Sequence, residues 1–281
     1  MKKIIIANLL MLFSISVSAQ KLEVVTTSTL KGPQGVVINA ITELAKTSGV
    51  DISPKQYGSC GEAVSYFNNS KDPIGVIWSD SMYRNSEITK QNCIIEFAKA
   101  KAIAVTFAPY DVCVRKDFKL SPGSSLTLGN TKFNPMVAQL EHMNKNSMDI
   151  KFKSVVFEGS ATTLTGLINR DIDVAYLATA NAAKAIQAGS IVCPYSTGST
   201  KYGQKPLSTF AGNNRVSEFK LGMMFFVKNL SPEQISKLEK SLAKEFASMM
   251  DRQEMVGSKV GITDADLSRF IEEGKFQATL K

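Results

Sequence analysis

Four turns in this sequence carry residues that suit the oxygens of an anion. Each lies where a short apolar run gives way to apolar residues at helical spacing. They are Ser28–Gly35, Gly58–Gly61, Asn130–Thr131 and Gly159–Thr163. Such turns offer backbone N–H groups, small hydroxyls and the positive end of a helix dipole, which suit a carboxylate without a buried charge. We therefore expect an anion-binding site, although glycine and serine also occur in turns for backbone reasons alone.

Two further strand ends supply candidate side chains. Trp78 and Asp80 end a run that predicts a buried strand, and Tyr176 and Thr179 end another. Trp78 is either a ligand wall or a core aromatic, and Asp80 either orients a polar ligand group or caps the next turn. The predicted ligand-binding residues are Ser28, Thr29, Leu30, Lys31, Gly32, Gln34, Gly35, Ser59, Cys60, Trp78, Asp80, Asn130, Thr131, Gly159, Ser160, Ala161, Thr162, Tyr176 and Thr179.

The sequence lacks the common catalytic motifs. It contains no GxSxG elbow, no GxxxxGK phosphate loop and no HExxH zinc motif. Cys60 is the one candidate nucleophile, but no base is identifiable beside it. The single histidine, His142, cannot supply a metal cluster, and the cysteines have no CxxC spacing. We therefore expect binding without catalysis, and neither a cofactor nor a metal.

Residues 1–19 predict a cleavable signal peptide. Lys2 and Lys3 precede the apolar run Ile4–Phe13, and small residues end at Ala19. The run is too short for a membrane-spanning helix, and the alternative is a buried N-terminal helix. Cleavage would make Gln20 the first residue, which leaves no cysteine there for lipid attachment. The sequence therefore predicts export to the periplasm.

The four cysteines fit an oxidising compartment. One disulfide among Cys60, Cys93, Cys113 and Cys193 is plausible there, but their spacing does not choose among the three full pairings. Buried free thiols are the alternative for Cys113 and Cys193.

The net charge of +8 falls to +6 when Lys2 and Lys3 are removed. Lysine and arginine are scattered singly and do not alternate with aromatic residues, so no nucleic-acid partner is expected.

The first 80 residues predict alternating strands and helices, and hence parallel strands with right-handed crossovers. The segments are Val24–Thr27, Val37–Ala45, Val50–Tyr57, Glu62–Phe67 and Pro73–Trp78. The runs Ile94–Phe97, Ala102–Phe107 and Tyr110–Arg115 follow without helices between them and suggest antiparallel strands at a hinge or edge.

A second alternating unit follows Ser121–Ser125. Its segments are a strand at Leu126–Gly129, a helix from about Pro135, a strand at Lys151–Phe157, a helix at Thr162–Arg170, a strand at Val174–Leu177, a helix at Ala180–Ala188 and a strand at Ile191–Cys193. Ser196–Arg215 predicts a long crossover, and Leu221–Val227 a return strand. We expect lobe 1 at residues 20–115 and 218–281, lobe 2 at 116–217, and C-terminal helices that pack on lobe 1.

Several segments resemble the periplasmic solute receptors of tripartite tricarboxylate transporters. Leu30–Val37 resembles their first ligand loop, and Gly58–Gly61 their glycine-rich turn after the second strand. Val155–Ala161, with Thr163–Leu167 and Asp171–Val174, resembles their second ligand loop and the elements after it. Phe226-Val227 and Ser231–Ile235 resemble their return strand and long C-terminal helix. The resemblance covers most of the mature chain.

The resemblance implies an α/β type 2 binding-protein fold, with two lobes that each hold a mixed, mainly parallel sheet flanked by helices. It implies a monomer that captures a small organic acid between the lobes and delivers it to an integral-membrane permease. The sequence departs from the family where Val36 and Val37, rather than an Asp, follow Gly35, and where Glu158 replaces a common Lys. The alternatives are a receptor for an inorganic oxyanion such as phosphate and an exported enzyme that uses Cys60.

Overall fold

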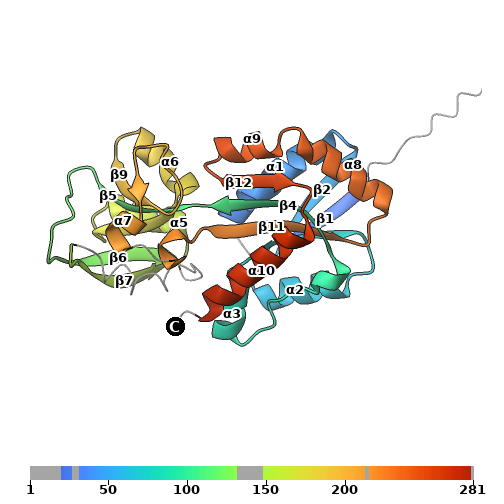
Figure 1. The fold of residues 1–281 in the computed structure, drawn as a ribbon, viewed down its shortest axis with the longest axis horizontal. Helices are drawn as coiled ribbons and strands as arrows, with labels where there is room; N and C mark the ends of the chain where they lie inside the picture. Colours follow the sequence, from blue (N-terminus) through green and yellow to red (C-terminus); the bar gives the residue numbers. More distant parts are fainter. Residues whose placement is uncertain (1–19, 27–31, 132–147, 213–214, 280–281) are drawn as a thin grey trace, which may run out of the picture.

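Two α/β lobes lie side by side and are joined by two crossing segments (Figure 1). The computed structural model describes residues 20–26, 32–131, 148–212 and 215–279. Lobe 1 has a six-stranded sheet in the order β12 (Val256–Val260), β4 (Lys101–Ala108), β11 (Leu221–Lys228), β3 (Ile74–Ser79), β1 (Gln20–Thr26) and β2 (Val50–Gln56). Strands β1, β2 and β3 are parallel, whereas β11 joins β3 and β4 antiparallel. The predicted α/β class with mixed sheets is confirmed.

Helices cover both faces of the lobe 1 sheet, because successive strand side chains point to opposite faces. Ile77 and Phe225 pack in one apolar cluster, and their neighbours Trp78 and Phe226 pack in another. Helices α1 (Pro33–Lys46), α8 (Pro232–Ala243) and α9 (Phe246–Arg252) cover the first face. Helices α2 (Cys60–Asn69), α3 (Met82–Thr89) and α10 (Asp264–Thr279) cover the second. The prediction that the C-terminal helices return to lobe 1 is confirmed.

Lobe 2 has a second six-stranded sheet. Its order is β10 (Lys205–Pro206), β9 (Ile191–Ser196), β5 (Tyr110–Arg115), β8 (Val174–Ala178), β6 (Ser125–Thr131) and β7 (Lys151–Phe157). Its described helices are α5 (Ser160–Ile168), α6 (Thr179–Gln187) and α7 (Ser208–Ala211). The helix predicted from Pro135 lies outside the described residues.

The first crossing between the lobes lies at Pro109, and not after Arg115 as expected. Tyr110–Arg115 forms β5, which pairs with β8 and β9 inside the lobe 2 sheet. The chain returns to lobe 1 between Gly212 and Leu221, with a short 3-10 helix at Arg215–Glu218. The apolar run Tyr110–Arg115 predicts a strand but does not show which strands pair with it. The lobe boundary was therefore placed too late in the chain.

Two local predictions in lobe 1 were wrong. Ile94–Phe97 is not a strand, and a 3-10 helix follows at Phe97–Lys99. Strand β12 was missed because Gly257 interrupts its short pattern and Gly261 follows directly after it; both have positive φ, which glycine adopts readily.

All four cysteines are disulfide-bonded, as Cys60–Cys93 and Cys113–Cys193. The second bridge joins the neighbouring strands β5 and β9. The cysteines are therefore neither free core thiols nor, in the case of Cys60, a free nucleophile.

No helix among the described residues has the length and apolar composition needed to cross a bilayer.

Candidate functional site

The first turn of α5 presents three backbone N–H groups that have no acceptor among the described residues. Gly159 caps this helix, and the N–H groups of Ser160, Ala161 and Thr162 come before the first intrahelical donor, Thr163, whose N–H donates to the Gly159 carbonyl. The Thr162 side chain is occupied locally: its Oγ1 accepts from the Gly159 N–H at 3.2 Å and donates to the Gly159 carbonyl at 2.8 Å. Ala161 and Thr162 are exposed, so this turn can receive an anion from solvent.

A glycine in β6 lets α5 pack closely on the lobe 2 sheet. A Cβ atom on Gly129 would lie 2.2 Å from Cδ1 of Ile172 and 3.0 Å from Cγ2 of Thr163. Gly166 lies against the ring of Phe157 in the same way. These contacts hold the first turn of α5 at the carboxyl edge of the parallel strands, where ligands bind in open α/β sheets.

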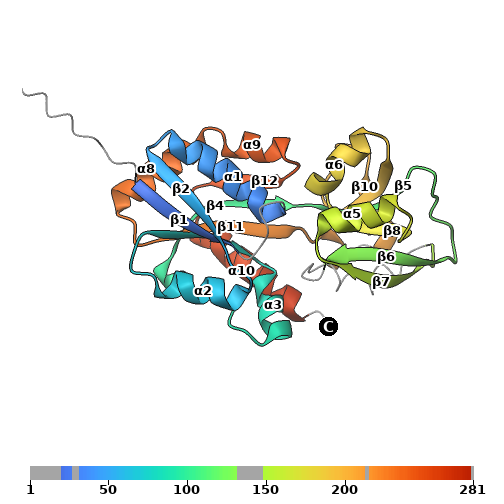
Figure 2. The ribbon, with the colours of Figure 1, turned by 180° about the vertical axis from the view of Figure 1, so that it is seen from behind.

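The first turn of α1 is the corresponding feature of lobe 1. Gly32 precedes the helix, Pro33 has no N–H, and the N–H groups of Gln34 and Gly35 have no acceptor among the described residues. The buried Gln34 side chain accepts a 2.5 Å hydrogen bond from Thr26, which ends β1. Figure 2 shows the first turns of α1 and α5 on the two sides of the junction between the lobes. The predicted contacts Ser28, Thr29, Leu30 and Lys31 lie outside the described residues.

Asn130 and Thr131 end β6 at the same sheet edge as the first turn of α5. The Asn130 amide nitrogen donates to Oγ of Ser154 at 2.7 Å. Its oxygen Oδ1 is buried and has no hydrogen-bond partner in the described part of the chain. An unpaired buried amide oxygen is costly, so it favours a donor from a ligand or from a neighbouring segment.

The turn at Gly58–Gly61 is occupied by contacts within lobe 1. Oγ of Ser59 accepts from the Glu62 N–H at 3.2 Å and caps α2. Cys60 is in a disulfide, and the Gly61 N–H donates to Oε1 of Gln91 at 3.4 Å. The structure thus gives Ser59 and Cys60 structural roles, and their ligand contact stays a prediction.

Trp78 and Tyr176 are core side chains in this conformation. Trp78 is 2% exposed, donates its Nε1–H to the Cys93 carbonyl at 2.8 Å and packs edge-on against Phe97. Tyr176 is 1% exposed, and its ring lies 5.4 Å from that of Tyr110. Neither ring presents a surface to solvent, so the core alternative is the one that the geometry supports.

Thr179 belongs to a buried polar cluster under the first turn of α6. Its Oγ1 donates to Oδ1 of Asp111 at 2.9 Å, and Nε2 of Gln204 donates to Oδ2 at 3.3 Å. Burial raises the pKa of Asp111 to about 6, while hydrogen bonds from Ser196, Thr179 and Gln204 oppose the rise. Asp111 also lies close to the sulfurs of Cys113 and Cys193, but their disulfide leaves no thiolate to bind a metal. This cluster connects the first strand of lobe 2 to its long crossover.

Replacing Asp111 by Asn should remove a pH dependence of stability. Because the folded-state pKa of about 6 exceeds the ordinary 3.8, the folded chain holds this proton more tightly than the unfolded chain. The resulting stabilisation is complete below about pH 3.8 and is lost as the pH rises through about 6. Two pKa units correspond to about 3 kcal/mol. Urea unfolding should therefore show the wild type losing about this much more stability than Asp111→Asn between pH 4 and 7; parallel pH profiles would contradict the assignment.

A contact across the lobe junction was not predicted from the sequence. Oε1 of Glu254, between α9 and β12, accepts from Nζ of Lys201 at 2.9 Å and from the Tyr202 hydroxyl at 2.6 Å. Lys201 and Tyr202 belong to the lobe 2 crossover, whereas Glu254 belongs to lobe 1 and is 9% exposed. Burial and the Glu254 carboxylate raise the pKa of Tyr202. No local signal marks residues this far apart in the chain.

A double-mutant cycle between Tyr202→Phe and Glu254→Gln should give a coupling energy of about 1 to 3 kcal/mol, because this part-buried hydrogen bond has a charged acceptor. Urea unfolding measures the four stabilities. Lys237→Gln is the control, since it breaks an exposed pair with Glu233 worth about 0.5 kcal/mol or less. Coupling no larger than that control would show that the contact does not hold the lobes together.

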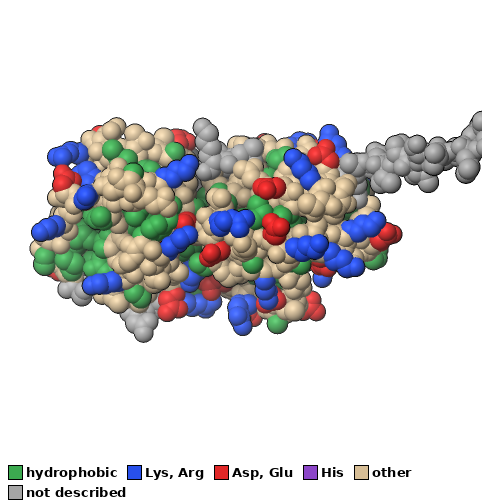
Figure 3. Space-filling model, turned by 90° about the horizontal axis from the view of Figure 1, so that it is seen from above, with side chains coloured by type: hydrophobic (Ala, Val, Ile, Leu, Met, Phe, Trp, Pro, Cys, Tyr) green, Lys and Arg blue, Asp and Glu red, His purple; other side chains and the backbone are tan. Residues whose placement is uncertain are grey.

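Charged side chains are mixed on the face of the molecule seen in Figure 3. Lysine and arginine side chains are dispersed there and lie among aspartate and glutamate. A nucleic-acid site would instead gather positive charge in a stripe or patch. The absence of a nucleic-acid partner stays a prediction.

The sequence matches no protein-family model, and no curated protein matches it. Solved structures do match in fold. A TctC solute-binding protein from Polaromonas, without ligand, is 15% identical, with 94% of this chain and 99% of that chain covered and a TM-score of 0.64. MatC from Rhodopseudomonas palustris with bound malate is 16% identical, with coverages of 93% and 98% and a TM-score of 0.67. The R. palustris protein Rpa4515 with adipate is 14% identical, with coverages of 92% and 94% and a TM-score of 0.71.

These structures confirm the fold that the sequence resemblance implied, because they match over nearly their whole length and over nearly all of this chain. The chain therefore has the two-lobed fold of the solute-binding proteins.

Proposed function

We propose that this chain is an exported receptor that holds a small organic carboxylate between its lobes. The observation that carries the proposal is the pair of helix first turns, α1 in lobe 1 and α5 in lobe 2, whose N–H groups have no partner among the described residues. Each turn offers donors and positive helix-dipole potential to one anionic group. Two turns on different lobes suit an acid that bridges them, and lobe closure would then enclose it.

Two of the matching structures support this ligand class. MatC is described with malate and Rpa4515 with adipate, and both ligands are dicarboxylates. The absence of an acidic residue at Val36 and Val37 argues against a ligand amine at the first turn. We therefore favour an organic acid over an amino acid as the ligand of the inter-lobe site.

Thermal unfolding with a panel of ligands tests the proposal. The protein is refolded from denaturant to remove carried-over ligand and is then scanned with malate, adipate, citrate, phosphate, sulfate and glucose. At about 100 times its Kd, the cognate acid should stabilise the fold by about 2.7 kcal/mol, which raises the Tm by about 5 to 10 °C. A response to glucose alone would refute the proposal. A response to phosphate or sulfate that exceeds every organic acid would favour the oxyanion receptor instead.

Export, delivery and oligomeric state complete the proposal. Residues 1–19 lie outside the described residues, and the secreted protein should begin at Gln20, which mass spectrometry of the mature chain checks. We infer that the loaded monomer delivers its acid to an integral-membrane permease and performs no catalysis. The alternative of an exported enzyme is not favoured, because its candidate nucleophile, Cys60, is in a disulfide with Cys93.

A further inference from the structure

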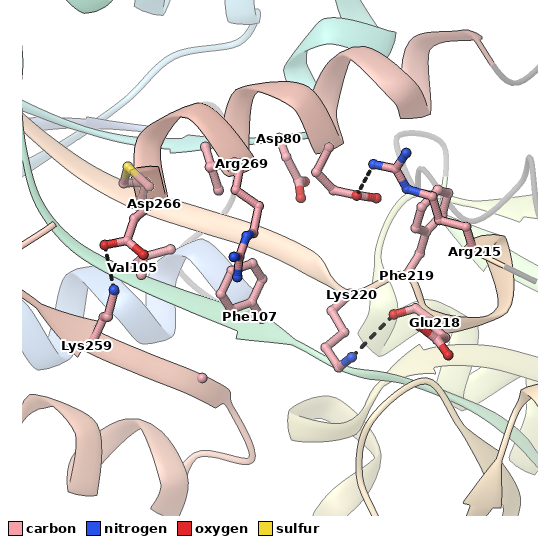
Figure 4. A pocket seen from close by; sticks show the side chains of 14 residues that line it. Asp80, Val105, Phe107, Arg215, Glu218, Phe219, Lys220, Lys259, Asp266 and Arg269 are labelled. Atoms are coloured by element: carbon pink, nitrogen blue, oxygen red, sulfur yellow. Dashed lines mark hydrogen bonds and ion pairs between the residues drawn. The ribbon is translucent and has the colours of Figure 1, made fainter. Parts of the chain in front are cut away.

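A second cavity lies on the opposite face of the lobe 1 sheet from α1. It has a volume of about 470 Å³, which is within the range of about 300 to 1,000 Å³ typical of small-molecule sites. It lies between α10, strands β4, β11 and β12, and the crossing segment at Arg215–Lys220 (Figure 4). The first turn of α1 packs on the other face, so this hinge pocket is separate from the inter-lobe site.

The hinge pocket has an aromatic and aliphatic part beside its charged side chains. Phe107, Phe219 and Phe270 line it together with Val105 and Met224. Such walls favour a flat apolar body, because ring contacts release water from both surfaces.

The hinge pocket is lined by four basic and four acidic side chains, and two of the basic ones are in ion pairs among the described residues. Arg215 pairs with Glu273 at 2.7 Å, and Lys259 pairs with Asp266 at 2.5 Å. Arg269 reaches into the pocket from α10 and has no ion pair among the described residues (Figure 4). Burial lowers the pKa of the half-buried Lys220, whose Nζ donates to the Glu218 carbonyl at 3.3 Å. Arg269 and Lys220 therefore suit one carboxylate.

Two acidic oxygens in the same pocket lack partners. Asp80 is fully buried; its Oδ2 accepts from the Gly222 N–H at 3.0 Å, while Oδ1 has no hydrogen-bond partner in the part of the chain that the structure describes. Oε1 of Glu273 is in the same situation. Burial raises the pKa of Asp80 well above its ordinary value, and Glu273 adds to the rise. A ligand hydroxyl can donate to the ionised Asp80 carboxylate or accept from the protonated carboxyl, and so can satisfy Asp80 in either state.

We propose that the hinge pocket is a second ligand site that takes an aromatic hydroxy acid, with its ring against the three phenylalanines, its carboxylate toward Arg269 and Lys220, and its hydroxyl toward Asp80. Each part of the ligand matches a separate feature of the pocket. The ring matches the apolar side chains, the carboxylate matches the cations without an ion pair among the described residues, and the hydroxyl matches the acidic oxygen without a hydrogen-bond partner there. The site does not depend on the inter-lobe proposal, because that proposal rests on the first turns of α1 and α5; Asp80, predicted from the sequence as a ligand contact, lines the hinge pocket instead.

Calorimetric titration of 4-hydroxybenzoate into the full chain carrying Gly159→Asp tests this site apart from the inter-lobe one. Binding should be measurable, and Arg269→Gln in the same background should weaken it by about tenfold or more. Arg252→Gln removes an exposed α9 arginine outside the pocket and is the matched control, with unchanged affinity expected. Benzoate, which lacks the hydroxyl, and 4-hydroxybenzyl alcohol, which lacks the carboxylate, should each bind more weakly.

The single tryptophan gives a site-specific readout, since the ring of Trp78 lies 5.9 Å from that of Phe270 in the pocket wall. Its fluorescence should change on saturation with 4-hydroxybenzoate, and the change should disappear in Arg269→Gln. No binding up to about 10 mM, or equal affinities in Arg269→Gln and Arg252→Gln, would overturn the proposal. Either result would leave the test of the inter-lobe site unaffected.

Discussion

Replacing Gly159 by aspartate is expected to weaken carboxylate binding between the lobes by about 100-fold or more while leaving the fold intact. The new carboxylate would accept hydrogen bonds from the free N–H groups of Ala161 and Thr162, which the ligand otherwise uses. It would also place a negative charge where the ligand anion binds. Both effects weaken binding. Their combined cost in binding free energy should exceed the cost of losing one hydrogen bond to a charged group.

The same substitution should stabilise the protein slightly. Gly159 has φ −171°, an extended conformation open to any residue, and a Cβ atom there meets nothing within 4 Å. An aspartate cap with favourable helix-dipole interaction adds about 0.5 kcal/mol. Lost binding therefore cannot be attributed to misfolding, and urea unfolding checks this.

Gly159→Ala is the matched control for the aspartate variant. It adds a side chain of similar backbone preference but no acceptor and no charge, so its affinity for the cognate acid should stay within about threefold of wild type. Calorimetric titration of the acid found in the thermal screen compares the three proteins. Wild-type affinity in Gly159→Asp would exclude the first turn of α5 from the site.

Removing the disulfide between Cys113 and Cys193 should cost about 4.5 kcal/mol of unfolding free energy. The bridge closes a segment of 80 residues, and the chain-entropy model gives about this value for a loop of that length. Cys60–Cys93 closes only 33 residues, which corresponds to about 3.7 kcal/mol. The paired substitutions Cys113→Ala/Cys193→Ala and Cys60→Ala/Cys93→Ala should therefore both destabilise, the first more strongly.

Urea unfolding of the two paired variants measures these losses. The wild type unfolded in a strong thiol reductant is the control, because it breaks both bridges without changing any side chain's size, and it should be less stable than either variant. A loss below about 1 kcal/mol for Cys113→Ala/Cys193→Ala would show that the bridge between β5 and β9 does not form in the native protein.

Local sequence signals determined much of lobe 1. The alternation from Val24 to Trp78 gave the β-α-β-α-β unit, because apolar spacing and turn residues act over a few positions. Ser231 caps α8 through a local motif: its Oγ accepts from the Gln234 N–H at 3.2 Å, and Oε1 of Gln234 accepts from the Ser231 N–H at 2.7 Å. The same local logic located the first turns of α1 and α5.

The turns at the candidate site differ in how far the sequence could define them. Gly159–Thr162 forms a helix first turn with free donors, as its composition predicted. Gly58–Gly61 has equally suitable residues, yet Ser59, Cys60 and Gly61 are all occupied by neighbours. Residue types show what a turn can bind, but only packing shows whether its groups are already used.

The sequence by itself determined the α/β class, most of the order of strands and helices, and the composition of the turns that we propose to bind the ligand. The tertiary structure alone decided the cysteine pairing, the transfer of β5 to lobe 2, the contact of Glu254 with Tyr202 and the place of Asp80 in the hinge pocket. Each of these joins residues far apart in the chain. Local sequence patterns act over a few positions and cannot show which distant segments meet, because that depends on how the chain closes long loops and crosses between the lobes.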